Sequence, residues 1–405
     1  MISDLMATLH AWGNHKTAPR LARRQQRAMR HPRLCAFLAW LYGNEATTGR
    51  ILQQNQIIFP AIFWPAPENA PLDPDAVLGT FQSAPATSLP EVFELPGQTY
   101  LRNLQKISPG LWNGRTYCMK AFDLTEGRPT LTCSSGHFFD ALVSCDLLEF
   151  ELLSAFGEVM PEEEAFPEFC ERLTLRGTLH ALGNPLHHAC GRSAAIGIST
   201  LIIFPAEGVY HVLLRSCGSR LAYLDKFFHT VPSLMMQPML ADERMEYSVR
   251  HNVYREYLEE VFGAVEGEMP YTPAQYHDIY ADPAIQYLQN REAAGSARLL
   301  LSGVAMDLLK LRPEICTLLL IDDPDWWPTH RQRLRPVTMV DSRCGSAGDL
   351  LKRSPATPLY AIKLSPELEL PAGLLCPERF TPPGAAALCL GLNLARQLLH
   401  ADFTD

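Results

Sequence analysis

Three glutamates at helical spacing are the residues of this 405-residue chain best placed to do chemistry. Glu256, Glu259 and Glu260 are three and four positions apart, so a helix would carry all three on one side. Carboxylates crowded in this way repel one another unless a cation neutralises them, and hard oxygen ligands suit Mg²⁺ or Mn²⁺. Such an ion can in turn clamp phosphate oxygens. A solvated helix face often has the same spacing, and for the isolated motif that plainer interpretation is favoured.

A hairpin and a helix must position these carboxylates. Two β-branched and apolar runs, residues 196–204 and 210–216, flank a turn at residues 205–208 and predict paired strands. Residues 247–262 have the apolar spacing of a helix. We also expect a buried strand at residues 316–321, and a terminal helix at residues 384–399 that follows two prolines. The mixture of strands and helices predicts an α/β fold.

Residues 255–260, Arg-Glu-Tyr-Leu-Glu-Glu, resemble the second half of the Nudix box, G-x5-E-x7-R-E-U-x-E-E-x-G-U, where U is a bulky aliphatic residue. Residues 213–216 resemble the strand that ends in Leu-x-x-Arg before that box, and residues 231–234 stand where the family usually has a Pro-Gly-Gly turn. The sequence departs from the box at three positions: glutamate is replaced by Tyr247, and the two glycines are replaced by Ala241 and Phe262. Over about residues 175–400, the wider pattern resembles larger bacterial proteins with a divergent Nudix-like domain.

The resemblance implies an α/β/α sandwich with a mixed sheet in residues 171–405. It implies that Glu256, Glu259 and Glu260 bind the metal, and that the metal activates water against the phosphoanhydride of a nucleoside diphosphate-linked substrate. Arg215 or Arg192 would contact phosphate. The protein would then be a metal-dependent hydrolase.

The departures from the box keep a second interpretation open. Without the upstream glutamate and the usual glycine turn, the domain is expected to be a catalytically inactive nucleotide-binding sensor or regulatory module. The kept Arg255-Glu256 and Glu259-Glu260 pairs favour the hydrolase, because a domain that only binds has less need of a charged metal face. In either case the expected partner is a nucleotide-type small molecule.

A basic helical segment is expected near the N-terminus. Residues 1–60 are predicted to be helical, and residues 5–44 contain no acidic side chain. Four arginines at helical spacing share one face: Arg20, Arg23, Arg24 and Arg27. This face is either a weak contact for phosphate or nucleic acid, or a solvated face that packs on the acidic remainder of the chain. Dense prolines in residues 60–96 predict a long connection.

Composition limits the class of protein. The sequence predicts a helical, basic region at 1–95, a small α+β region at 96–170 and the Nudix-like domain at 171–405. A net charge of −9 argues against nonspecific nucleic-acid binding as the main activity. The chain has no apolar run of membrane-spanning length and no secretory leader pattern, and its eleven cysteines form no C-x-x-C pair. We therefore expect a cytoplasmic protein with free thiols and no membrane partner.

Two other clusters have plainer explanations. His180, His187, His188 and Cys190 contain metal-ligand types, but no recognised spacing completes a site, so loop histidines are expected. Asp322-Asp323-Pro324-Asp325 follows an apolar strand and is expected to form a turn.

Overall fold

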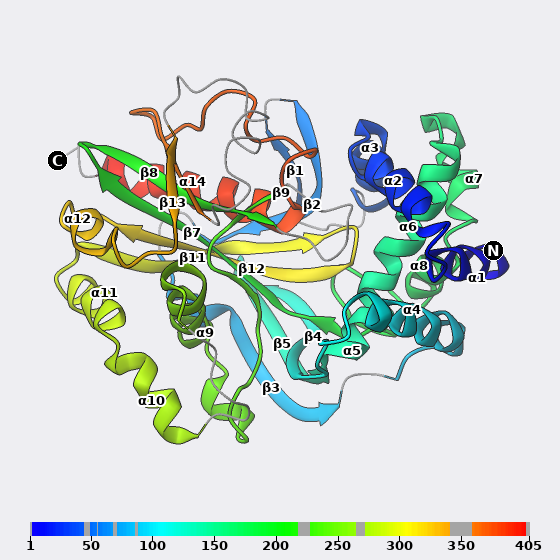
Figure 1. The fold of residues 1–405 in the computed structure, drawn as a ribbon, viewed down its shortest axis with the longest axis horizontal. Coiled ribbons are helices and arrows are strands. Elements are labelled where there is room, and N and C mark those ends of the chain that lie inside the picture. Colours follow the sequence, from blue (N-terminus) through cyan, green and yellow to red (C-terminus); the bar gives the residue numbers. More distant parts are fainter. Residues whose placement is uncertain are drawn as a thin grey trace.

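Two mixed β-sheets and helices on both faces of the larger sheet make up the described part of the chain (Figure 1). The computed structural model describes residues 2–43, 49–54, 56–67, 71–85, 88–217, 227–264, 272–340 and 359–401. The expected α/β class is therefore confirmed.

The larger sheet has the strand order β1-β2-β11-β12-β7-β8-β14-β13, with β10 beside β7 and β9 beside β8. Strands β12 and β7 are parallel, as are β13 and β14, and the other described pairs are antiparallel. Its strands are β1 (Arg50–Gln54), β2 (Ile57–Pro65), β7 (Gly197–Ala206), β8 (Val209–Cys217), β9 (Phe227–Thr230), β10 (Ser233–Met235), β11 (Ala297–Asp307), β12 (Arg312–Ile321), β13 (Val337–Val340) and β14 (Leu359–Lys363).

The smaller sheet has the order β3-β5-β4-β6. Its strands are β3 (Leu78–Pro85), β4 (Arg115–Thr125), β5 (Arg128–His137) and β6 (Ala194–Ala195). The β4–β5 and β7–β8 hairpins each turn on a Glu-Gly pair whose two residues have positive φ, at 52° and 76° for Glu126-Gly127 and at 54° and 77° for Glu207-Gly208. Two consecutive positive φ angles match the right-handed twist of the flanking strands, and glycine adopts them without steric cost. The predicted hairpin over residues 196–216 is confirmed.

Helices of the first half of the chain gather at one end of the molecule (Figure 1). They are α1 (Ile2–Trp12), α2 (Ala18–Met29), α3 (Pro32–Tyr42), α4 (Glu94–Ile107), α5 (Phe138–Ala141), the π-helix η3 (Leu142–Asp146), α6 (Leu147–Val159), α7 (Phe166–Cys170) and α8 (Thr174–Ala181). Arg176 of α8 fastens this group to the sheet. It donates to the Tyr42 hydroxyl at 2.7 Å and to the carbonyls of Leu308 and Leu309, between β11 and β12, at 2.9 and 2.6 Å.

The helices of the second half cover both faces of the larger sheet. They are α9 (Val249–Glu256), the π-helix η7 (Tyr257–Phe262), α10 (Pro273–Ala281), α11 (Pro283–Ala293), α12 (Trp326–His330) and α14 (Pro382–Ala401). Alternate residues of β7 face opposite ways: Leu201 and Ile203 pack with α14, whereas Ile202 and Phe204 belong to the core that includes α9 and α12. The sheet is thus sandwiched between helices. Short 3₁₀ turns complete the fold: η1 (Pro74–Val77), η2 (Glu91–Phe93), η4 (Glu163–Ala165) and η6 (Glu243–Glu246).

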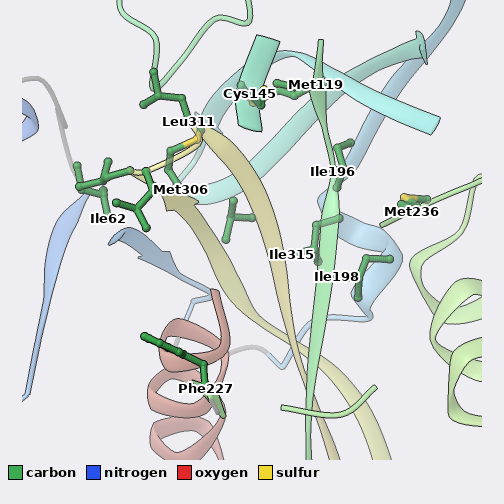
Figure 2. Packing of buried hydrophobic residues seen from close by; sticks show 14 of the residues in the cluster. Ile62, Met119, Cys145, Ile196, Ile198, Phe227, Met236, Met306, Leu311 and Ile315 are labelled. Atoms are coloured by element: carbon green, nitrogen blue, oxygen red, sulfur yellow. The ribbon is translucent and has the colours of Figure 1, made fainter. Parts of the chain in front are cut away.

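One hydrophobic core joins the two sheets and the first-half helices. Figure 2 shows Ile198 and Ile315 of the larger sheet in the same cluster as Met119 of β4 and Cys145 of η3. The nine cysteines whose side chains the structure describes are free thiols, as expected. Within the described residues, no helix combines the length and the apolar character that crossing a membrane requires.

The N-terminal prediction needs two corrections. The helical prediction for residues 1–60 is correct for α1, α2 and α3 and wrong for residues 50–54 and 57–60, which form β1 and the start of β2. The proline-dense segment 60–96 is more than a connection, because it contains the end of β2 and all of β3. Pro60 fits into β2 because it lies where the β1–β2 register shifts, so its missing N–H removes no regular ladder bond. Strand β2 pairs with β11, and the larger sheet therefore draws strands from both 1–95 and 171–405.

Candidate functional site

The predicted carboxylate helix is present and changes its geometry along its length. Ser248 precedes α9 and accepts a hydrogen bond from the N–H of His251 at 3.1 Å, which caps the helix. Asp75 of η1 adds a second acceptor for the first turn, from the N–H of Arg250 at 3.1 Å. After Glu256 the chain continues as the π-helix η7 and ends at Gly263, whose φ is 78°. A π-helix has i→i+5 hydrogen bonds and a wider turn, so the α-helical spacing used in the sequence argument no longer holds for the last two glutamates.

Glu260 and Arg215, two of the predicted site residues, lie together. Arg215 Nε is 3.5 Å from Glu260 Oε1, and Arg215 Nε and NH2 donate to the Ser233 hydroxyl at 3.1 and 2.7 Å. The N–H of Ser233 donates to Glu260 Oε2 at 2.7 Å. Three segments therefore meet here, the end of β8, the start of β10 and η7, and both oxygens of Glu260 have partners.

Glu256 is paired with Arg255. Arg255 NH2 lies 3.5 Å from Glu256 Oε1, and the arginine side chain is only 3% exposed. The guanidinium also donates to the Gln237 carbonyl and to Asn252 Oδ1, both at 3.2 Å, while the buried Nε has no hydrogen-bond partner among the described residues. Arg255 is thus buried inside the fold, and its guanidinium places a positive charge beside the carboxylate of Glu256.

Glu246 is a buried glutamate that the sequence argument missed. It precedes by one residue the position where the box glutamate was sought, and its Oε1 lies 3.9 Å from Arg255 NH1. Its Oε2 accepts a hydrogen bond from the N–H of Met239 at 2.6 Å, and its Oε1 faces His251 Nε2 at 3.2 Å. Burial opposes the charge, but the hydrogen bonds from His251 and the backbone and the charge of Arg255 lower the pKa of Glu246 below its usual value. The sequence signal for Glu246 is an acidic residue one position away from the place of the upstream glutamate in the Nudix box.

His251 completes this buried group. Burial lowers the pKa of its imidazole, so the ring is neutral at pH 7 and donates from Nε2 to Glu246. Its Nδ1 then accepts from the Tyr280 hydroxyl at 2.9 Å, and the ring stacks on Tyr276 with centroids 4.3 Å apart. Every polar atom of the imidazole is used, which indicates a structural role for this histidine at the start of α9.

The three predicted metal ligands differ in their surroundings. Glu256, Glu259 and Glu260 are all partly exposed, in a stretch whose other residues between 251 and 261 are buried. They therefore face the surface along one side of the element. Two of them already contact an arginine, however, and no group of three or more His, Cys, Asp or Glu side chains in the described part of the chain is arranged to hold a metal ion. In this arrangement the carboxylates do not fit a Mg²⁺ or Mn²⁺ site.

Arg192 is buried away from solvent. It is 1% exposed, and its guanidinium donates to the carbonyls of Leu311 and His188 at 3.0 Å each and to that of Pro185. Burial lowers the pKa of Arg192 below its usual value. An arginine enclosed in this way holds backbone carbonyls together, and of the two predicted phosphate contacts only Arg215 is brought to the carboxylates.

The other clusters have the plain explanations expected from the sequence. His187 Nδ1 lies 3.1 Å from the Phe122 carbonyl, and His180 Nε2 lies 3.2 Å from the Tyr42 hydroxyl, so these two histidines have separate structural partners. The loop expectation is wrong for His180, which lies in α8. Asp323 accepts from the N–H of Asp325 at 3.0 Å and pairs with Arg291 at 2.7 Å. This carboxylate therefore forms the predicted turn.

No family model matches the chain, and the search of curated proteins found no match. The Nudix-like interpretation therefore stays a prediction from the residues of the box.

Proposed function

We propose that this protein contains a Nudix-like module that binds a nucleotide-type small molecule without hydrolysing it, and that it acts as a sensor or regulatory module. The observation that carries the proposal is the pairing of Arg215 with Glu260. A guanidinium supplied by the chain takes the place beside the carboxylate that a metal ion would take in a hydrolase. A site neutralised in this way can bind phosphate but lacks the ion that activates water.

Arg215 is suited to contact phosphate. Its side chain is 29% exposed, and Ser233 and Glu260 hold its Nε and NH2 edge in place. Within the described residues its NH1 has no hydrogen-bond partner, so both N–H groups of NH1 remain for a ligand. A positioned guanidinium loses little conformational freedom when it binds an oxyanion.

A metal-dependent hydrolase of a nucleoside diphosphate-linked substrate is the second candidate, favoured by the shared partial exposure of Glu256, Glu259 and Glu260. It requires Mg²⁺ or Mn²⁺, and it requires the pairs of Glu256 with Arg255 and of Glu260 with Arg215 to open.

Binding and turnover measured side by side separate the two candidates. Purified protein is titrated with nucleoside diphosphates, triphosphates and diphosphate sugars in a calorimeter, with EDTA, Mg²⁺ or Mn²⁺, and products are followed by chromatography. The variants are Arg215→Gln, Glu259→Gln and Glu260→Gln. Arg172→Gln is the matched control, because Arg172 also pairs with a glutamate, at 3.0 Å, on another part of the surface.

The binding module predicts saturable binding in EDTA that Arg215→Gln weakens at least tenfold and Arg172→Gln leaves unchanged. Metal-dependent turnover would support the hydrolase instead of the binding module, provided that Glu259→Gln and Glu260→Gln each abolish it. If the protein neither binds nor hydrolyses any compound of the panel, both candidate functions are refuted. We further propose a cytoplasmic location, supported by the free thiols, of which Cys35, Cys118, Cys133, Cys145 and Cys316 are buried.

A further inference from the structure

A groove of about 660 Å³ lies between α1, α2 and α6, far along the chain from the carboxylate helix. One wall carries the four arginines that the sequence places on one face of α2, namely Arg20, Arg23, Arg24 and Arg27, and the opposite wall is formed by small residues of α1. Gly157 of α6 lies at the groove, where its missing side chain lets α2 approach closely: a Cβ there would lie 2.9 Å from Arg24 Cγ.

The charge of these four arginines has no counterpart among the described residues. None of the four is in an ion pair there, whereas Arg33 and Arg172, on the neighbouring segments, pair with Glu162 at 2.7 Å and Glu158 at 3.0 Å. Arg33 and Arg172 are therefore neutralised within the described structure, whereas the four groove arginines are not. Four guanidiniums on one helix face repel one another, and an anion between them removes that repulsion.

Two further observations point to an anionic ligand. Arg24 Nε is buried and has no hydrogen-bond partner among the described residues, so a buried donor stands at the groove without an acceptor. Helix α2 begins beside Thr17, which lines the groove and whose side chain does not cap the helix. The positive end of the helix dipole therefore adds to the arginines at this end of the groove.

We propose that this groove binds a small molecule that carries several phosphate groups. Arg20 and Arg27 are seven residues apart, or roughly 10 Å along a helix axis. A chain of phosphates can contact guanidiniums along this whole length, whereas a single phosphate would require the arginines to converge on one point. The groove volume is that of a small-molecule site, and the net charge of −9 disfavours an extended nucleic acid as the occupant. This site is independent of the function proposed for Arg215 and Glu260.

Inorganic tripolyphosphate is the probe for this site. Its binding to the full chain is measured by calorimetry at low and at physiological salt, beside orthophosphate and a single-stranded oligonucleotide. Two double variants, Arg20→Gln with Arg24→Gln and Arg23→Gln with Arg27→Gln, remove the charge in pairs and keep good helix formers. Arg128→Gln, at the exposed β4–β5 turn, is the matched control, and circular dichroism checks that each variant is folded.

We expect saturable tripolyphosphate binding that is at least tenfold tighter than orthophosphate binding, and that each double variant weakens at least tenfold. Arg128→Gln should leave it within twofold of the parent, which shows that the loss in the double variants comes from the groove arginines. Replacing the same arginines by lysine keeps the charge but not the forked donors, and should give an intermediate affinity. Unsaturable binding, unchanged binding in the double variants, or tighter binding of the oligonucleotide would each overturn the proposal.

Discussion

Lys310 Nζ lies 2.5 Å from Asp146 Oδ1, and this pair joins the tip of the β11–β12 hairpin to the π-helix η3. Glu149 of α6 approaches the same ammonium at 3.4 Å and is 1% exposed. Burial opposes the charge, yet the carboxylates of Asp146 and Glu149 raise the pKa of Lys310 above its usual value. The contact between the first-half helices and the larger sheet therefore includes an ionic cluster as well as the apolar core.

Replacing Lys310 by methionine should destabilise the protein by about 3–5 kcal/mol, because two buried carboxylates would lose their cation. The free energy of unfolding can be measured by urea titration at pH 7. Lys106→Met, at an exposed position of α4, is the control and should change it by less than about 0.5 kcal/mol. A loss below about 1 kcal/mol for Lys310→Met would show that the cluster contributes little to folding.

Glu314 of β12 should make stability fall as the pH rises. Burial raises the pKa of its carboxyl to about 7, against an ordinary value of 4.5, although a hydrogen bond from Ser199 and the charge of Arg312 oppose the shift. Between these two values the folded protein holds a proton that the unfolded chain has released. The contribution of Glu314 to the free energy of unfolding is therefore fully present below about pH 4.5 and is lost progressively up to about pH 7. The total loss is at most about 3 kcal/mol.

Urea titrations at pH 5, 6, 7 and 8 measure this dependence. Glu314→Gln cannot ionise and keeps an oxygen that accepts from Ser199, so its stability should fall less steeply over the same range. Glu151, whose pKa burial also raises to about 7, should leave a residual slope in the variant. Equal slopes for the parent and Glu314→Gln would refute the assignment.

Glu260 should matter for folding through the hydrogen bond that it accepts. Glu260→Ala leaves the N–H of Ser233 and the guanidinium of Arg215 without this acceptor, and should cost about 1–3 kcal/mol. Glu260→Gln keeps an acceptor oxygen and loses only a partly exposed ion pair, so it should cost less than about 1 kcal/mol. Thermal unfolding compares the two variants, and equal losses would mean that the backbone hydrogen bond is not what Glu260 supplies.

Gly157 should not tolerate a methyl group. A Cβ at this position would lie 2.9 Å from Arg24 Cγ and 3.0 Å from the backbone oxygen of Arg24, so Gly157→Ala must push α2 away from α6. We expect a loss of about 1–3 kcal/mol in the free energy of unfolding. Gly177 in α8 is the control, since nothing lies within 4 Å of its Cβ position and alanine is the better helix former. Gly177→Ala should stabilise the protein, and two changes of the same sign would contradict the packing argument.

Local patterns in the sequence were enough to predict the β7–β8 hairpin, α9 and α14, because each depends on side chains close along the chain. Strand β1 and the beginning of β2 were misassigned as helix for the opposite reason. The pairing of β2 is decided by β11, and the position of Pro60 at a register shift is visible only in the folded sheet.

The candidate site was predicted only in part. The glutamates at 256, 259 and 260 lie together on the partly exposed side of one element, but the arginines that pair with two of them could not be assigned from spacing. Arg192 was ranked with Arg215 because its acceptors, two carbonyls of the loop at residues 185–188 and that of Leu311, leave no mark in the sequence. Arg192 is buried and Arg215 is partly exposed, and this difference follows from the fold and cannot be read from spacing.

The pairing of β2 with β11 also sets the order in which this protein can form during synthesis. Pro65 pairs with Gly303, so β2 leaves the ribosome about 240 residues before its neighbour. At synthesis rates of roughly 5–20 residues per second this interval is on the order of 10 to 50 s. During that time β2, with its apolar residues Phe59, Ile62 and Trp64, has no β11 to pair with. A nascent chain of this kind is a natural client for chaperones that bind exposed strands, and translation speed should affect its yield.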